Sequence, residues 1–284
     1  MLTPHDTVTL TQAIILGVIQ GLTEFLPISS SAHLRVIPAA LGWQDPGAAY
    51  SAVIQLGSSI AVVTYFFKDL VQIATGSIQA LKEKNYGSAD LRLAACIILG
   101  TAPVCIIGLL VKKILEQPDS PMRALWVVGT SSIVMAIFLM VAELVAKHKR
   151  KMNEMGVQDG LLVGLGQALA LIPGCSRSGS TLTVALLLGL NRSDAARFSF
   201  LLGIPAVLLS GLVELKEVVG VSFAQSDLIN LTVGVIVSTI FSYISIAWLI
   251  KFLQSHTTWV FVAYRIIFGA FVLCMSFGLI HPHG

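Results

Sequence analysis

The sequence predicts an all-α polytopic membrane protein, with six transmembrane helices plus two re-entrant helical hairpins in an inverted-topology repeat. Three observations support this fold class. Hydrophobic residues make up 55% of the 284 residues, charged residues only 12%, and mean hydropathy is +0.85, whereas soluble domains carry about 25% charge. Six apolar stretches are long enough to cross a bilayer. Two further apolar regions are interrupted by Pro and Ser, and they resemble each other.

The six expected spans contain roughly 20 residues each, as a bilayer requires, and they are 48–67, 91–111, 124–146, 195–214, 228–250 and 258–280. The two interrupted regions are 10–42 and 158–190. Each half of these regions, at about 15 residues, is too short to cross comfortably alone. We therefore expect each region to be a hairpin that returns to the side it entered from. Non-helical backbone at this depth is tolerated when it is buried in protein or lines a wet cavity.

Basic residues are distributed unevenly if both hairpins are re-entrant. One side then holds Lys68, Lys82, Lys84, Arg92, Lys147, Lys149, Arg150, Lys151, Arg192, Arg197 and Lys251. The other side holds Lys112, Lys113, Arg123 and Lys216. The richer side is expected to be cytoplasmic, with both termini outside. Hairpins that crossed the membrane twice would give the same loop sides, so charge does not decide between these topologies.

The two interrupted regions predict an internal repeat within a single integral membrane domain, 1–284. Pro27 and Pro173 lie 146 residues apart, and neighbouring Ser, Leu-Gly and Ala-Ala matches keep that spacing within one residue. The repeats would run approximately over 10–146 and 158–281. Because three spans separate the hairpins, the second repeat enters from the opposite face, and a site is expected near the midplane. The alternative is a plain helical bundle with proline kinks.

The first hairpin carries polar groups that are costly in a membrane and therefore suggest function. Gln20 and Glu24 are four residues apart on one helical face, and Pro27 ends that helix. A serine run follows where the second half-helix needs an N-cap. The candidate site residues of this segment are Glu24, Ser29, Ser30, Ser31 and His33. Two structural alternatives remain open: serines that bond back to the preceding turn, and a protonated Glu24 in a structural hydrogen bond.

The second hairpin contains a run from Pro173 to Thr181 that predicts an anion site. Gly174 lets backbone approach a ligand closely, and Ser176 or Ser178 can cap the next half-helix. The free N–H groups and the dipole of that helix end favour an anion, and the planar fork of Arg177 suits phosphate oxygens. Two such helix ends meeting at mid-membrane would cradle a phosphate. Arg265, in the last span, could reach this site or pair structurally.

At these residues the sequence resembles the bacterial undecaprenyl-pyrophosphate phosphatase family, first known for bacitracin resistance. That family carries an (E/Q)xxxE segment, a PxSSxxH loop and a PGxSRSGxT segment, which here run from Gln20 to Glu24, Pro27 to His33 and Pro173 to Thr181. The similarity covers essentially the whole chain. Gln20 stands where other members have Glu, which removes one candidate metal-binding carboxylate.

The resemblance implies a function and a location. The enzyme would hydrolyse undecaprenyl diphosphate to undecaprenyl phosphate and phosphate, which recycles the lipid carrier of cell-wall synthesis. It would sit in the bacterial inner membrane, with its site opening to the outer face, and would need a divalent cation, Mg²⁺ or alternatively Ca²⁺. The expected partners are the polyprenyl diphosphate and membrane lipids, with a homodimer as a further expectation. A net charge of +3 without a basic aromatic patch does not favour nucleic acid.

These residues suggest a mechanism as a hypothesis. Ser30 would be the nucleophile, with His33 as its base, while Glu24 orients His33 or binds the metal ion together with Gln20. Arg177 would hold the transferred phosphoryl group, together with the expected substrate-binding residues Ser29, Gly174, Ser176, Ser178, Gly179 and Thr181. Direct attack by water remains open. The competing function is an inverted-repeat transporter or flippase of anionic or polyprenyl-phosphate substrates, which would need binding groups but no nucleophile and base.

Overall fold

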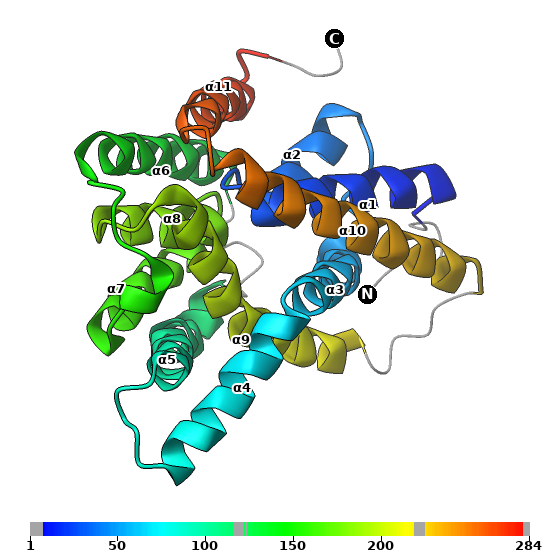
Figure 1. Ribbon diagram of the computed structural model, residues 1–284. Coiled ribbons are helices and arrows are strands. Elements are labelled where there is room, and N and C mark those ends of the chain that lie inside the picture. Colours follow the sequence, from blue (N-terminus) through cyan, green and yellow to red (C-terminus); the bar gives the residue numbers. More distant parts are fainter. Residues whose placement is uncertain (1–7, 116–121, 123, 219–224, 281–284) are drawn as a thin grey trace.

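The computed structural model describes residues 8–115, 122, 124–218 and 225–280 (Figure 1). Within these ranges the chain is helical and contains no strand, as the sequence predicted. The longer helices are α1 (Leu10–Phe25), α2 (Ser30–Ala40), α3 (Gly47–Tyr65), α4 (Phe67–Lys82), α5 (Ala89–Leu115), α6 (Leu125–Val145), α7 (Val157–Ala168), α8 (Arg177–Leu187), α9 (Arg192–Val218), α10 (Gln225–Phe252) and α11 (Trp259–Ser276). Two short 3-10 helices, η2 (Met152–Glu154) and η3 (Leu169–Leu171), precede and follow α7.

Five of these helices are long and apolar enough to cross a membrane: α5, α6, α9, α10 and α11. A sixth span results when α3 and α4 are counted as one bent helix pair, with an angle of 61° between them. Each predicted span falls on one of these elements. The prediction of a polytopic membrane protein is therefore confirmed, and the apolar composition reflects surfaces that face lipid.

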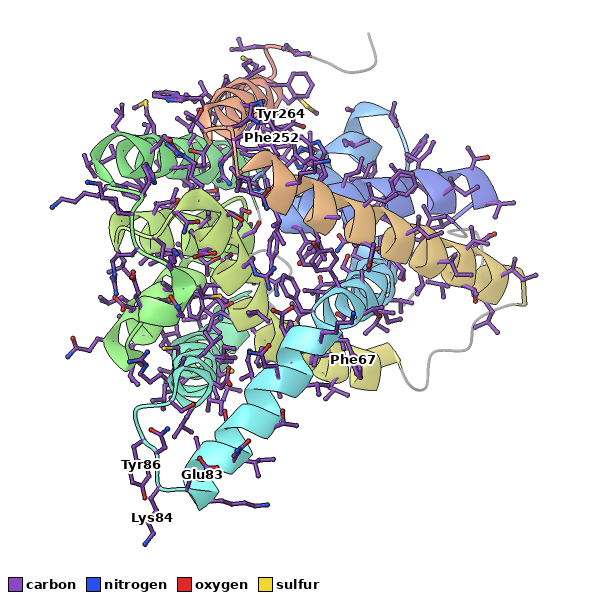
Figure 2. All side chains as sticks on the ribbon, viewed as in Figure 1. Phe67, Glu83, Lys84, Tyr86, Phe252 and Tyr264 are labelled. Carbon is purple, nitrogen blue, oxygen red and sulfur yellow. The ribbon has the colours of Figure 1, made fainter. Side chains whose placement is uncertain are left out.

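The helical structure continues beyond the first predicted span, because α4 follows α3 after the bend. Phe66 is buried at the bend, and the guanidinium of Arg197 lies 5.6 Å from the centre of its ring. Arg197 also forms an ion pair with Asp69 in the first turn of α4, which ties the bend to α9. Figure 2 shows the far tip of this segment, with Glu83, Lys84 and Tyr86, pointing away from the other helices.

The first half-helix of each hairpin packs closely against one long span. Helix α1 lies along α10 and α7 lies along α5 (Figure 1). A Cβ added at Gly17 would lie 2.8 Å from the carbonyl oxygen of Gly234, and one at Gly160 would lie 2.6 Å from Cα of Cys96. Small residues at these crossings let the backbones touch, as is common between membrane helices. The two hairpins thus occupy equivalent surroundings, as a repeat would require, while the repeat boundaries stay a prediction.

The two hairpins also break in the same way. Ser29 and Ser176 are the N-caps of α2 and α8, and their φ values of 76° and 68° lie in a region that L-residues rarely adopt. Such a conformation costs of order 1–3 kcal/mol and persists only where the surroundings impose it. Each break is preceded by a proline, Pro27 or Pro173, which has no N–H to continue a helix. Two strained serines therefore stand at matching positions of the repeat.

The assignment of loops and termini to the two sides of the membrane stays a prediction, because several of the residues on which it rests lie outside the described residues. This applies to Arg123, to the side chains of Lys112, Lys113 and Lys216, to both chain termini and to residue 281 at the end of the second repeat.

Candidate active site

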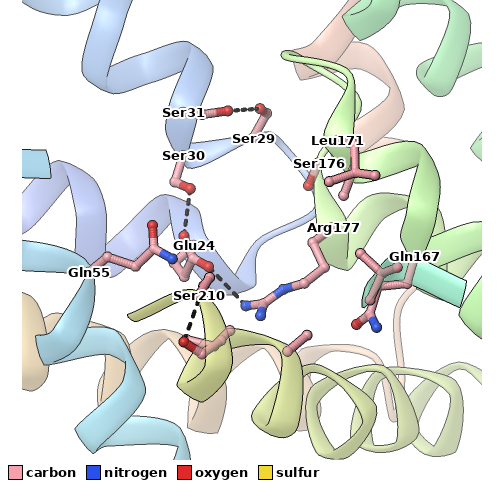
Figure 3. Close-up of a pocket in the computed structure, with 14 residues that line it drawn as sticks. Glu24, Ser29, Ser30, Ser31, Gln55, Gln167, Leu171, Ser176, Arg177 and Ser210 are labelled. Carbon is pink, nitrogen blue, oxygen red and sulfur yellow. Dashed lines mark hydrogen bonds and ion pairs between the residues drawn. The ribbon is translucent and has the colours of Figure 1, made fainter. Parts of the chain in front are cut away.

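A cavity of about 240 Å³ lies where the two breaks meet (Figure 3). Both sequence motifs contribute to its wall, through Glu24, Ser29, Ser30, Ser31, Ser176 and Arg177. Helices α3, α5, α7 and α9 and η3 supply the rest: Gln55, Val104, Gln167, Ala170, Leu171, Ala206, Val207 and Ser210. The structure thus brings together two segments that are far apart in the sequence, in a space large enough for a phosphorylated head group.

Glu24 is the centre of the hydrogen-bond network in this cavity. Its Oε2 accepts from Ser30 Oγ at 2.6 Å and from Gln20 Nε2 at 3.0 Å. Its Oε1 accepts from Nη2 of Arg177 at 2.8 Å, across the boundary between the two motifs. A carboxylate that accepts three bonds, one of them from a guanidinium, is held in a single orientation. Glu24 therefore joins the nucleophile candidate of the first repeat to the cation of the second (Figure 3).

Ser30 and His33 are not paired with each other in the described part of the chain. His33 Nδ1 lies 2.7 Å from the carbonyl oxygen of Ser29, and its Nε2 lies 2.7 Å from the hydroxyl of Tyr264. A carbonyl can only accept, so Nδ1 carries the proton, and Nε2 of a neutral imidazole accepts from Tyr264. The ring also stacks on Phe268, 4.2 Å away. The hydrogen-bond partner of Ser30 is Glu24, and the role of His33 as base stays a prediction.

The second motif places its hydroxyls in several different environments. Ser176 Oγ caps α8 by accepting from the N–H of Gly179 at 3.2 Å, which was one of two caps that the sequence allowed. Ser178 donates to the carbonyl of Leu26 in the first break, at 2.9 Å. Thr181 bonds back to the carbonyl of Arg177 at 2.8 Å and also contacts the hydroxyl of Ser199. Ser176 and Arg177 line the cavity, whereas Ser178 joins the two breaks.

Comparison with known proteins then identifies the family. The family model described as "Bacitracin resistance protein BacA" matches residues 13–271. This chain belongs to the BacA family. Its relatives include the undecaprenyl-diphosphatase of Gloeobacter violaceus, which is 57% identical over 92% of this chain and 90% of the relative. Those of Trichormus variabilis and Synechococcus elongatus are 55% and 51% identical, over 92% and 94% of this chain and 82% and 93% of the relatives.

The described residues of this BacA-family chain contain no group of three or more His, Cys, Asp or Glu side chains that could hold a metal ion. The cavity instead offers one carboxylate, Glu24, beside hydroxyl and amide groups. This donor set fits Mg²⁺, which proteins bind through one or two carboxylates together with substrate phosphates. Gln20 is buried and directs its Nε2 to Glu24 and to Ser58 Oγ, so in this structure it orients the carboxylate.

Arg265 is a residue whose role the sequence left open, and the structure defines its contacts. It is 1% exposed and donates to the carbonyls of Pro27 in the first break (3.0 Å) and Gly174 in the second (2.8 Å). It also donates to the carbonyls of Cys175 and Ser132, both at 3.2 Å. Broken helices leave carbonyls that need partners inside a membrane. Arg265 supplies these partners and connects both breaks, so it fixes the position of one break relative to the other.

Proposed function

We propose that this BacA-family protein hydrolyses undecaprenyl diphosphate to undecaprenyl phosphate and inorganic phosphate, which recycles the lipid carrier of bacterial cell-wall synthesis. The observation that supports this most directly is the chain of contacts from Ser30 through Glu24 to Arg177 in one cavity. It combines a hydroxyl nucleophile, a carboxylate base and a phosphate-binding cation. Phosphoryl transfer depends on positioning and charge stabilisation, and this arrangement provides both. The curated relatives carry the name of the same activity.

In the proposed first step, Ser30 Oγ attacks the terminal phosphorus of the diphosphate. Its proton passes to Glu24 Oε2, which lies 2.6 Å away in the structure. The bond between that phosphorus and the bridging oxygen breaks, and undecaprenyl phosphate leaves. Arg177 neutralises charge on the phosphoryl oxygens, since a guanidinium fork matches their geometry. Hydrogen-bonded contact between nucleophile and base is the arrangement that activates a serine.

In the proposed second step, water attacks the phosphoserine and releases inorganic phosphate, with Glu24 returning the proton to Ser30. Direct attack of water on the diphosphate is the alternative, in which Glu24 would activate the water and Ser30 would only position it. His33 is a residue of α2, and its ring bonds to the carbonyl oxygen of Ser29 and to the hydroxyl of Tyr264. In this proposal it acts as a positioning residue for the strained serine of the first break.

A divalent cation, Mg²⁺ or Ca²⁺, belongs to the same proposal. Glu24 would repel a diphosphate if it faced one without compensation, and Arg177 supplies only one positive charge. A cation held by Glu24 and the diphosphate oxygens would remove this repulsion. Gln20 would keep the Glu24 carboxylate aimed at the ion. The remaining features of the proposal are an inner-membrane location, a cavity open to the outer face and a prenyl tail that lies between helices in lipid.

The test is phosphate release from undecaprenyl diphosphate by the full chain purified in detergent, with and without Mg²⁺. Ser30→Ala and Arg177→Ala would be measured alongside wild type. Turnover that collapses in both variants would support the serine mechanism, whereas collapse in Arg177→Ala alone would favour direct attack by water. Folded wild type that releases no phosphate with any divalent cation would exclude the phosphatase. A transporter would then be tested in liposomes, since only an enzyme turns over without a sealed compartment.

A further inference from the structure

One polar side chain in the wall of the cavity has no hydrogen-bond partner among the described residues. Gln167 is 0% exposed, and among the described residues neither its Oε1 nor its Nε2 has a hydrogen-bond partner. Buried polar groups are nearly always hydrogen-bonded, and an unsatisfied one destabilises the folded protein. This buried amide lines the same cavity as Glu24 and Arg177, so a ligand in the cavity is the natural source of the missing partners.

The repeat explains why this amide is free. Gln167 lies 147 residues after Gln20, at the matching place in the second hairpin. In the first hairpin, Gln20 donates to Glu24 one turn later. The position one turn after Gln167 is Leu171, which also lines the cavity and offers no acceptor. The second repeat has therefore kept the amide and lacks the carboxylate that would bind it.

The amide lines the same cavity as the guanidinium of Arg177. In Figure 3, Gln167 is on the opposite side of Arg177 from Glu24. Within the described residues Arg177 donates from Nη2 to Glu24 and from Nη1 to the carbonyl of Gly203, at 2.8 and 3.2 Å. A guanidinium has five N–H bonds, so N–H bonds remain for a ligand. Glu24 and the carbonyl of Gly203 therefore each take one of these N–H bonds among the described residues.

We propose that Gln167 is a substrate-binding residue, whose Nε2 donates to oxygens of the terminal phosphoryl group that Arg177 also holds. This inference rests on the proposed function and adds a residue to its site. A hydrated phosphoryl group supplies both partners that the amide needs: oxygens that accept from Nε2, and water or P–OH that donates to Oε1. The neutral amide adds a hydrogen bond without a second positive charge, which leaves the Glu24–Arg177 ion pair undisturbed.

The variant Gln167→Met tests this proposal, because methionine keeps the length of the side chain and removes the amide. A hydrogen bond to a charged group contributes about 1.5–3 kcal/mol, so kcat/KM should fall on the order of 10- to 100-fold. The inhibition constant of inorganic phosphate should rise by a similar factor. The melting temperature should stay the same or increase, because two unsatisfied polar atoms leave the protein interior. Gln79→Met, at an exposed site on α4, is the matched control and should change none of these values.

The outcomes separate this inference from the proposed function. Wild type that releases no phosphate would contradict the proposed phosphatase function itself. Active wild type, with Gln167→Met unchanged in kcat/KM or in the phosphate inhibition constant, would overturn the assignment of Gln167 alone. A marked fall in melting temperature would also overturn it, because the amide would then have a structural partner. If Gln167→Met does not fold, Gln167→Glu keeps the shape. Its carboxylate should compete for Arg177 and raise KM, and an unchanged KM would overturn the proposal.

Discussion

Arg265 offers a sharp test of how the cavity is held together. It donates four hydrogen bonds from one buried guanidinium, to Pro27, Gly174, Cys175 and Ser132. The variant Arg265→Lys keeps the positive charge and loses the planar fork. An ammonium has three donors on a single nitrogen, so at least one of the four carbonyls, and by geometry a second, would lose its partner.

The expected loss of stability follows from the number of carbonyls that lose their donor. Each buried acceptor left without a donor costs about 1–3 kcal/mol, so the loss of two donors should lower the free energy of unfolding by about 2–6 kcal/mol. The two breaks would also shift relative to each other, which separates Ser30 from Arg177. A displacement of about 1 Å can cost 100-fold in rate, so kcat for phosphate release should fall by about two orders of magnitude.

The assay is a denaturant titration in detergent micelles, followed by phosphate release under native conditions. Arg92→Lys is the control, because Arg92 is exposed and its guanidinium donates to the carbonyl of Asn153 at 3.0 Å. Its effect should stay within about 0.5 kcal/mol. If Arg265→Lys were equally stable and fully active, charge alone would explain the burial of Arg265. The idea that its fork connects the two breaks would then be abandoned.

Three further changes test the site and the packing, and one tests the cation. Glu24→Gln keeps a hydrogen-bond partner but removes the base, so kcat should fall by roughly 10²–10⁴-fold while the melting curve keeps its cooperative shape; activity near wild type would exclude Glu24 as the base. Tyr264→Phe removes the hydroxyl beside His33 Nε2 and should cost about 1 kcal/mol with little change in kcat, and a collapse of turnover would instead place His33 in the chemistry. Gly160→Ala puts a methyl group 2.6 Å from Cα of Cys96 and should cost about 1–3 kcal/mol in a denaturant titration, so an unchanged stability would show that α5 and α7 can separate. EDTA should abolish phosphate release and added Mg²⁺ should restore it, whereas turnover that resists the chelator would remove the cation from the mechanism.

Much of the fold could be predicted because it depends on local composition. Long apolar runs such as 228–250 define spans by their length alone, and Pro27 and Pro173 define breaks because they lack an N–H. The bend between α3 and α4 was not predicted. Helix α4 mixes polar and apolar residues, and its direction depends on Phe66 and on the contact of Asp69 with Arg197, which belongs to a helix far along the chain.

For the candidate site, the sequence by itself determined which chemical groups are present and that two matching segments carry them. Only the tertiary structure decided how these groups pair. Spacing along α2 made His33 the nearest base for Ser30, but the packing of α11 directs His33 to Tyr264 and leaves Ser30 to Glu24. The contact between Glu24 and Arg177 joins residues 153 positions apart. Side-chain pairing depends on how helices pack and on which rotamers that packing allows, and neither property can be read from the spacing of residues along one helix.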